Sequence, residues 1–442
     1  MPKKAVAIYF IAAFIGAVLF VLFTFPRTKE EIPTSNNQRP FPSAPEPGPN
    51  GVPIPETVPH PNTPKVPPGP NLRVMAWASA SEAQALEAEA AAFEAATGRR
   101  ASMTIESDPA AYRSDLQQAV ASDSPPDVCL VDARDFSGID PARDLAGVPA
   151  NPDAAPRTLS AFTVDKQIKA VPDEFSVDVL FYNPNHFDQA GIGYPGTHWT
   201  WDILESIGRG LASRNLKDGS GQPVYALELP ADFNLWNVLC SEAGHPALDQ
   251  DVWHLTDAGS KDSQMRALDL IHEVFQEFAI TAPLSKPDAI PGSFFAQQRA
   301  SLLIGPSDLT ALLPKFPYAF TLLPSDLTRA STARVNGWAI PARSTQQEAA
   351  RVLAAYLAWK PVHAGWSSVL KPAEGDTPES LCYEALGQSV IPRIESKNVA
   401  MTRFLDQQID LLARTFTQKT SDTYTRIQAE FQNLKATPPD GG

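Results

Sequence analysis

The chain has little cysteine and no excess of positive charge. Its three cysteines, Cys129, Cys240 and Cys382, show no C-x-x-C spacing, so the sequence predicts neither a disulfide framework nor a structural zinc site. We expect Cys129, which lies in an apolar run, to be an inert core thiol. Lysine and arginine number 36 against 50 aspartates and glutamates, a formal net charge of -14. Such a chain offers no broad basic surface for phosphate backbones, and nucleic acid is not expected as a partner.

Signatures of catalysis are also missing. The sequence contains no G-x-S-x-G elbow, no phosphate-binding G-x-x-x-x-G-K-[ST] loop and no H-E-x-x-H motif. Residues 272–273 begin this last motif, but Gln276 stands where its second histidine belongs. Asp132, Asp135 and Asp140 are close in sequence, yet spacing alone does not place two carboxylates across a glycosidic bond. We therefore expect no catalytic residues, no cofactor and no bound metal ion.

An apolar run near the N-terminus is long enough to cross a membrane. Residues 5–25 form 21 positions without a charge, and a span needs about 20. The run exceeds the ~7–15 residues of a secretory apolar region and is not followed by an A-x-A-like cleavage signal. We predict a transmembrane anchor over residues 1–25, with a signal peptide as the alternative. Two basic residues stand on each side of the run and give no orientation. The shortness of the leading segment and the globular domain that follows favour a cytoplasmic N-terminus.

Residues 26–70 are dominated by proline. This segment holds 15 prolines in 45 positions and almost no apolar periodicity. Proline removes backbone donors and fixes φ near an extended value, and a segment of this composition cannot bury a core. We predict a disordered linker that, fully extended at ~3.1 Å per residue, reaches on the order of 140 Å.

The composition changes at Asn71, where folded structure is expected to begin. An apolar strand at 72–77 is followed by Ser79-x-x-Glu82, a capping box opening a helix that ends at Gly98. Further strands are expected at 102–106, 128–131, 177–182, 301–304 and 319–323, and helices at 112–120, 201–211, 265–278 and 344–356. This alternation predicts an α/β fold with parallel strands and right-handed crossovers. The sequence shows no internal repeat of 20–50 residues, which argues against a solenoid or a propeller.

Five stretches, taken in order, resemble a known family. They are residues 72–78 with the helix ending at 93–98, then 124–132, 170–183, 190–204 and 335–341. Their order and spacing are similar to those of the extracellular, or periplasmic, solute-binding proteins of ABC transporters, of the sugar- and oligosaccharide-binding type. Three features depart from that pattern. The predicted membrane span replaces a removable or lipidated signal, the proline-rich linker is long, and residues 138–167 match the family only weakly.

The resemblance implies a two-lobed periplasmic-binding-protein-like α/β fold with a cleft between the lobes. We expect a solute-binding domain at 71–437, in which lobe 1 covers about 71–178 and 300–335 and lobe 2 about 179–299 and 336–437. In open α/β sheets the carboxyl ends of the strands face such a crevice. Lobe closure would present a distinct shape to the transmembrane subunits of an ABC permease.

A carbohydrate ligand needs aromatic faces and hydrogen-bond acceptors. Trp77 and Trp338 stand where members of the family commonly place ring platforms, and Asp132 ends a strand where it could accept from hydroxyls. Trp236 and Ser307 are further candidates. For each tryptophan the alternative is ordinary core packing, because the chain has eight of them.

These observations predict a protein that captures a carbohydrate or similar small polar solute without changing it, for an ABC-type importer. We expect it in the cell envelope, anchored in the inner membrane with its binding domain in the periplasm or on the extracellular face. One alternative keeps the fold as a sensory or interaction protein without transport. Another is a membrane-anchored glycan-active enzyme, which would require two converging carboxylates.

Overall fold

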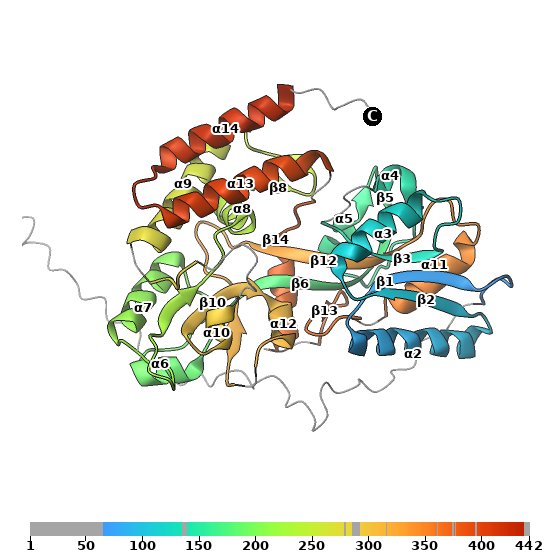
Figure 1. Ribbon diagram of the computed structural model, residues 1–442, viewed down its shortest axis with the longest axis horizontal. Helices are drawn as coiled ribbons and strands as arrows, with labels where there is room; N and C mark the ends of the chain where they lie inside the picture. The colour runs from blue at the N-terminus through green and yellow to red at the C-terminus, as the bar shows by residue number, and fades with distance from the viewer. Residues whose placement is uncertain are drawn as a thin grey trace, which may run out of the picture.

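The computed structural model describes residues 65–134, 139–277, 280–284, 292–314, 316–359, 361–373, 375, 377–393 and 396–436. The predicted anchor and residues 26–64 of the predicted linker lie outside the described residues. Within the described part of the chain, no helix has both the length and the apolar character of a membrane span. The folded part forms two α/β lobes joined by long strands (Figure 1), as the resemblance implied.

Lobe 1 is built on three parallel strands, β1 (Leu72–Trp77), β2 (Ala101–Glu106) and β3 (Val128–Asp132). Helices α2 (Ala80–Thr97), α3 (Pro109–Ala121) and α11 (Gln347–Leu357) pack around them. The predicted capping box starts α2, and Gly98, at φ 72°, ends it in the left-handed conformation. Four shorter elements complete the lobe: α4 (Pro141–Asp144), α5 (Pro156–Ala161), β4 (Thr163–Val164) and β5 (Gln167–Ile168).

Two antiparallel strands, β6 (Ala170–Tyr182) and β12 (Ser331–Ala339), run from one lobe into the other. We call them the hinge strands. In lobe 1, β12 pairs with β3. In lobe 2, β6 pairs with β10 (Ala300–Pro306) and β11 (Ala319–Thr321), and β7 (Tyr225–Glu228) pairs with β10 at the far edge. The strand order is β2-β1-β3-β12-β6-β10-β7, so one sheet passes through both lobes.

Helices surround the lobe 2 part of this sheet. They are α6 (Pro184–Ala190), α7 (Trp201–Ser213), α8 (Phe233–Glu242), α9 (Ser260–His272), the π-helix η1 (Glu273–Glu277), α10 (Ser293–Ala296) and the 3-10 helix η2 (Ser307–Ala311). The final pair, α13 (Ser396–Arg414) and α14 (Thr420–Ala436), packs on α9, and α13 also packs on α8 (Figure 1). The short strands β8 (Leu248–Asp249) and β9 (Val252–Trp253) form a separate hairpin.

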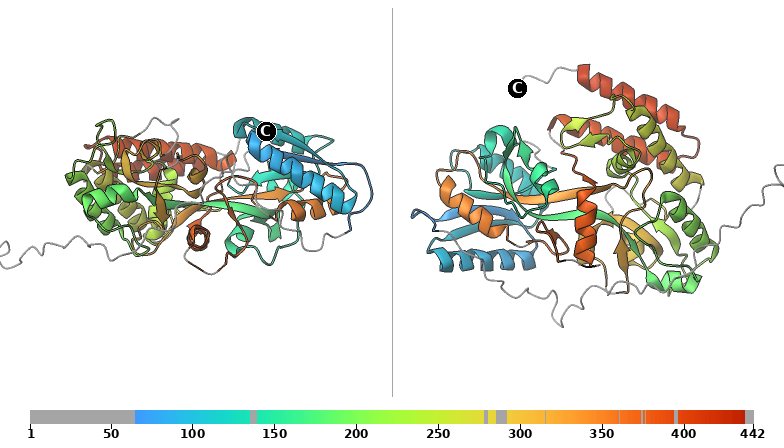
Figure 2. Two further views of the ribbon diagram at one scale, coloured as in Figure 1. Left: turned by 90° about the horizontal axis from the view of Figure 1, so that it is seen from below. Right: turned by 180° about the vertical axis from the view of Figure 1, so that it is seen from behind.

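After α11, and before the final helix pair, the chain returns to the hinge strands. There α12 (Pro378–Gly387) packs against both hinge strands, flanked by β13 (Ser367–Ser368) and β14 (Ser389–Val390). Figure 2 shows α12 in orange-red at the middle of the molecule, between the lobes. The β13 strand pairs with β6 and β14 pairs with β12. The hinge is therefore thickened by a third chain segment.

The expected division of the chain between the lobes differs from the observed pairing. We expected residues 300–335 in lobe 1, but β10 and β11 pair with β6 in lobe 2. We expected residues 336–437 in lobe 2, but α11 packs on α2 and β3 in lobe 1, and the expectation holds only for α13 and α14, which pack on lobe 2 helices. The reason is that the chain crosses the hinge once along β6, remains in lobe 2 through β11, and crosses back along β12. Periodicity identifies strands but not the lobe whose sheet they join.

The hinge strands present one apolar and one polar face. Side chains alternate along a strand, and those we call the apolar hinge face are Phe175, Val177, Val179, Ala333 and Val335, all fully buried in one hydrophobic core. Those we call the polar hinge face are Glu174, Ser176, Asp178, Thr332, Arg334 and Asn336. The register places Ser176 beside Arg334 and Glu174 beside Asn336, so the polar residues of the two strands lie side by side.

The polar alternation ends at an irregularity between Asn336 and Gly337. A Cβ atom at Gly337 would lie 2.7 Å from the Val171 carbonyl oxygen and 2.8 Å from Cε2 of Phe162. Only glycine fits this close approach of two strands. The following residue, Trp338, then turns into the core of lobe 1.

Candidate functional site

A cavity of about 210 Å³ lies over the polar hinge face, where the two lobes meet. We call it the hinge pocket. Its floor is formed by Ser176, Asp178, Thr332 and Arg334 of the hinge strands. Lobe 1 contributes Arg134, just after β3. Lobe 2 contributes the start of α7 and α8, the end of β10 and Leu323, through Trp201, Pro230, Asp232, Asn234, Leu235, Val238, Ile304, Gly305, Pro306 and Leu323.

Both arginines of the hinge pocket have carboxylates of the protein beside them. Arg334 forms an ion pair with Asp308, and its guanidinium lies 4.9 Å from the centre of the Trp366 ring. Asp308 also accepts a hydrogen bond of 2.6 Å from the Ser176 hydroxyl. The Nε atom of Arg134 lies 3.7 Å from an oxygen of Asp132. These pairings fix the guanidinium groups at the edge of the pocket and offset their charge.

Two further carboxylates, Asp178 and Asp232, line the same pocket. Burial raises the pKa of Asp178 to about 7, and repulsion from Asp232 adds to this rise while Arg334 and Arg134 oppose it. Asp232 caps α8 by accepting a hydrogen bond of 3.0 Å from the Leu235 amide, and burial raises its pKa as well. Within the described residues, the Asp178 carboxylate has no hydrogen-bond or ion-pair partner.

A buried hydroxyl lies beside these carboxylates. Thr332 is 4% exposed, and its Oγ1 atom has no hydrogen-bond partner among the described residues. Buried polar groups are almost always paired, because losing water without a replacement costs roughly 1–3 kcal/mol. An unpaired hydroxyl that lines a cavity is therefore placed to bind something that enters the cavity.

Lobe 1 closes the other end of the polar hinge face through Glu174. This fully buried carboxylate accepts hydrogen bonds from Asn336 Nδ2 at 2.8 Å and from the amides of Val362 and His363 at 2.7 and 2.9 Å. It also pairs with His363 Nδ1. Burial lowers the pKa of His363, but the charge and hydrogen bond of Glu174, the charge of Glu82 and the hydrogen bond to the Trp77 carbonyl oxygen together outweigh it, and the pKa is raised. The imidazole stacks on Trp77 with ring centroids 3.7 Å apart and planes 25° apart.

Three of the five predicted site residues lie around the polar hinge face. Trp77 is half-buried at the end of β1, with one ring face covered by His363. Asp132 ends β3 beside Arg134. Ser307 is buried at the start of η2, where its hydroxyl accepts from the Val177 amide at 3.3 Å and lies 3.3 Å from the Ser176 hydroxyl. Ser307 thus supports the pocket floor from behind.

The other two, Trp236 and Trp338, are both 0% exposed. Trp338 is packed in the core of lobe 1 and donates its indole N–H to Asp173 at 3.0 Å. Trp236 is packed in the core of lobe 2, with its indole nitrogen 3.5 Å from the Gln264 carbonyl oxygen. Neither ring has a face open to the hinge pocket in this structure, so the expectation of a ring platform does not fit them. Core packing, the stated alternative, describes both.

Sequence reasoning missed the residues that form the pocket floor. Asp178, Thr332 and Arg334 were not candidates, although a signal for them exists. Residues 174–179 and 332–336 alternate strictly between polar and apolar side chains. In a strand that is buried on both faces, such alternation indicates that one face meets something polar.

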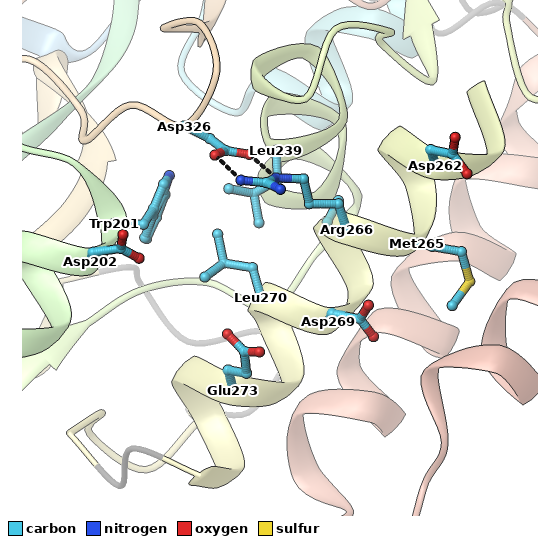
Figure 3. A pocket seen from close by; sticks show the side chains of 11 residues that line it. Trp201, Asp202, Leu239, Asp262, Met265, Arg266, Asp269, Leu270, Glu273 and Asp326 are labelled. Carbon is cyan, nitrogen blue, oxygen red and sulfur yellow. Dashed lines mark hydrogen bonds and ion pairs between the residues drawn. The ribbon is translucent and has the colours of Figure 1, made fainter. Parts of the chain in front are cut away.

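A larger cavity, of about 470 Å³, lies on lobe 2 alone, between α7, α9 and the loop after β11 (Figure 3). Its lining is acidic, with Asp202, Asp262, Asp269 and Glu273, and Arg266 crosses it to pair with Asp326. No group of histidine, cysteine and acidic side chains suited to a metal ion is present in the described part of the chain. Unlike the hinge pocket, this cavity contains no residue from lobe 1.

Comparison with known families identifies the architecture. Residues 77–360 match the family described as bacterial extracellular solute-binding protein. The chain belongs to this family. The family is one of binding proteins, in agreement with the prediction of a protein that captures a solute without acting as an enzyme. The resemblance drawn from five sequence stretches is thereby confirmed.

Solved structures share the two-lobed fold. A cyclic alpha-maltosyl-1,6-maltose binding protein from Arthrobacter globiformis has a TM-score of 0.67 at 18% identity, covering 84% of this chain and 100% of that one. An ABC substrate-binding protein from Listeria monocytogenes, in complex with cycloalternan, has a TM-score of 0.65 at 16% identity, covering 83% and 99%. A cyclo/maltodextrin-binding protein complexed with maltotetraose has a TM-score of 0.68 at 13% identity, covering 84% and 99%. A search of curated protein sequences finds no match.

Proposed function

We propose that this protein is a tethered receptor that captures a carbohydrate or similar small polar solute in the hinge pocket and delivers it to an ABC importer. The observation that carries the proposal is the pocket itself, whose floor is the polar face of both hinge strands and whose walls come from both lobes. A solute held there contacts both lobes at once, so its binding free energy favours the closed arrangement. The sugar ligands of the similar structures support the class of solute.

The proposed ligand contacts are polar rather than aromatic. Asp178, Asp232 and Thr332 offer acceptors inside the pocket, and Asp132 lies beside the lining residue Arg134. Trp77 is the one predicted tryptophan that is partly exposed, and it lies at the lobe 1 end of the polar hinge face. Carboxylate oxygens accept from sugar hydroxyls, and a ring face suits their C–H surfaces.

A thermal-shift screen of the full-length protein in detergent micelles tests this proposal, with sugars, oligosaccharides, polyols and amino acids as ligands. A ligand at about 100 times its dissociation constant adds roughly 2.7 kcal/mol to the folded state. The variant Asn234→Trp places an indole ring in the pocket from the first turn of α8. It should abolish the ligand-induced shift in melting temperature. The matched control is Asp262→Asn on the exposed rim of the lobe 2 cavity, which should keep it.

Two results would contradict the proposal. A flat response across the panel would favour the sensory or interaction role. A shift that persists in Asn234→Trp would place the binding site outside the hinge pocket.

We further propose that residues 1–25 anchor the chain in the membrane and that residues 26–70 act as a spacer. The 21-residue uncharged run and the 15 prolines that follow it support this arrangement. Full-length protein should stay in the membrane pellet after alkaline carbonate extraction, and a chain that starts at residue 26 should not. Mass determination of the mature chain separates an anchor from a signal peptide, because cleavage would remove the apolar run.

A further inference from the structure

The charges at the hinge pocket do not balance. Its two guanidinium groups, Arg134 and Arg334, have Asp132 and Asp308 beside them. Asp178 and Asp232 remain in the pocket as two further carboxylates. They repel one another, because each raises the electrostatic free energy of ionising its neighbour in a partly dehydrated space. A neutral hydroxyl can donate a hydrogen bond to such a carboxylate, but only a cation also offsets the charge.

The pocket also has an acceptor that the protein does not use. Thr332 lies directly opposite Asp178 on the neighbouring hinge strand, as the pairing of Ala333 with Val177 requires. Its buried Oγ1 atom has no partner among the described residues, and Thr332 is one of the residues that line the cavity. A group with several hydrogen-bond donors and a positive charge would satisfy the carboxylates and this hydroxyl together. A primary ammonium group has three donors and one positive charge.

We propose that the hinge pocket selects solutes that carry a protonated amine, such as an aminated sugar or polyol, and holds the ammonium group between Asp178, Asp232 and the Thr332 hydroxyl. This inference rests on the proposed function and narrows its class of ligand. It assigns the charge of the ligand to the lobe 2 end of the polar hinge face. The rest of the solute extends toward Arg334 and Arg134.

The size and lining of the pocket agree with a small polar ligand. Its volume of about 210 Å³ equals that of about seven water molecules at ~30 Å³ each, which suits one sugar-sized ring. Trp201, the single aromatic residue among those lining it, is 5% exposed and donates its indole N–H to Glu242 at 2.7 Å. Recognition inside the pocket therefore depends on charge and hydrogen bonds rather than on ring stacking.

Ammonium binding should be coupled to the ionisation of Asp178. The charged groups that act on this carboxylate are Asp232 and Asp308, which raise its pKa, and Arg134 and Arg334, which lower it. With a pKa of about 7 in the empty pocket, Asp178 is largely protonated near pH 6 and largely ionised near pH 8. A cation binds the ionised form, so its binding near pH 6 should release a proton from Asp178. A neutral sugar that binds in the same pocket should release no proton from Asp178.

Isothermal titration calorimetry of the full-length protein in detergent micelles tests the inference. Glucosamine, galactosamine and mannosamine are compared with glucose, galactose and mannose and with the neutral N-acetyl derivatives, near pH 7. A set of matching polyols, 1-amino-1-deoxysorbitol and sorbitol, extends the comparison beyond rings. Hydrogen bonds to charged groups contribute about 1.5–3 kcal/mol, so at least one aminated solute should bind about tenfold to hundredfold more tightly than its neutral forms.

Two substitutions locate the preference. Asp178→Asn keeps the side-chain shape but removes the charge, and it should reduce the advantage of the aminated form to about twofold or less and remove the proton release measured in buffers of different ionisation enthalpy. Thr332→Val removes the unpaired hydroxyl and should weaken aminated solutes several-fold. Asp262→Asn, an equal charge change on the exposed rim of the other cavity, should leave both the preference and the proton release unchanged.

The outcomes distinguish this inference from the function on which it rests. If neutral and N-acetylated forms bind as tightly as the aminated ones, the carbohydrate receptor stands and the amine selectivity is wrong. A preference that survives in Asp178→Asn also overturns the inference, because the charge would then act elsewhere. If no sugar or polyol of the panel binds at millimolar concentration, both the carbohydrate function and the amine selectivity are wrong.

Discussion

The two faces of the hinge strands differ sharply in polarity. The apolar hinge face holds Phe175, Val177 and Val335 in a core that passes from one lobe to the other. The polar hinge face, on the opposite side of the same strands, carries carboxylates, hydroxyls and a guanidinium. The comparison shows how a single pair of strands serves two purposes. One face fixes the connection between the lobes, and the other forms the floor of the binding pocket.

The apolar face should show the largest effect on stability. Phe175→Ala should lower the free energy of unfolding by about 3–5 kcal/mol, because it removes a fully buried ring and leaves a cavity. Urea unfolding followed by tryptophan fluorescence measures the change. At temperatures where the variant remains folded, its solute affinity should equal that of the unchanged protein. A loss below about 1 kcal/mol would show that the apolar face does not join the lobes as we describe.

On the polar face, Glu174 should matter most for stability. Its carboxylate accepts from Asn336, Val362 and His363 and is fully buried. Glu174→Gln removes the charge partner of His363 and puts an NH2 group where the surrounding groups need an acceptor. The free energy of unfolding should therefore fall by about 3 kcal/mol. The same variant should lower the pKa of His363, which NMR titration of the imidazole would reveal. An unaltered histidine titration would refute this pairing.

Asp178 should behave in the opposite way, because its removal stabilises the empty protein. Its pKa is raised from 3.8 to about 7 by burial, so folding is favoured while it is protonated and disfavoured once it ionises. The contribution of the protonated Asp178 carboxyl to the free energy of unfolding is fully present below about pH 4 and is lost as the pH rises through 7. Asp178→Asn should therefore leave the melting temperature unchanged near pH 4 and raise it near pH 8.

The size of this effect has an upper bound. One pKa unit corresponds to about 1.4 kcal/mol, so the shift cannot supply more than about 4 kcal/mol. Solvent in the pocket screens part of it, and we expect about 2 kcal/mol. Calorimetric melting at several pH values measures the difference between the two proteins. A melting-temperature difference that does not depend on pH would contradict the burial of this carboxylate.

The smallest effect on stability is expected at Thr332. Its buried Oγ1 atom has no partner to lose, so Thr332→Val should raise the free energy of unfolding by about 1 kcal/mol, because it removes a polar group that was desolvated without compensation. Thr158→Val gives the matched contrast, because the fully buried Thr158 hydroxyl donates to the Ala155 carbonyl oxygen at 2.7 Å. That variant should lose about 1 kcal/mol or more. Equal losses for the two threonines would mean that the Thr332 hydroxyl does have a partner.

Much of the fold could be predicted from the sequence because its signals are local. The capping box at Ser79 and Glu82, the glycine that ends α2 and the apolar runs of β1 and β3 each act within a few residues of chain. The family resemblance depended on the order of such segments. The lobe that β10 and α11 join could not be predicted in this way, because both choices bury the same apolar stripes.

The site was less accessible to sequence reasoning. Trp338 was predicted from its place in the family pattern and Trp236 as a further tryptophan, but ring size favours the core as strongly as it favours a ligand face. Asp178 and Thr332 are 154 positions apart along the printed sequence, and no local rule brings them together. Both residues belong to strands in which polar and apolar side chains alternate strictly. That alternation indicates a binding surface only when both faces of the strand are buried, and the sequence does not show this burial.

The sequence by itself determined the class of the protein: an acidic α/β chain without catalytic motifs, preceded by an apolar run and a proline-rich segment. Those properties follow from composition and from periodicities of two and 3.6 residues, which do not depend on distant contacts. Only the tertiary structure decided which polar residues share a pocket, which tryptophans are enclosed and which carboxylates have partners. Burial, pairing and pKa are properties of neighbours in space, and here the antiparallel register of β6 and β12 chooses those neighbours.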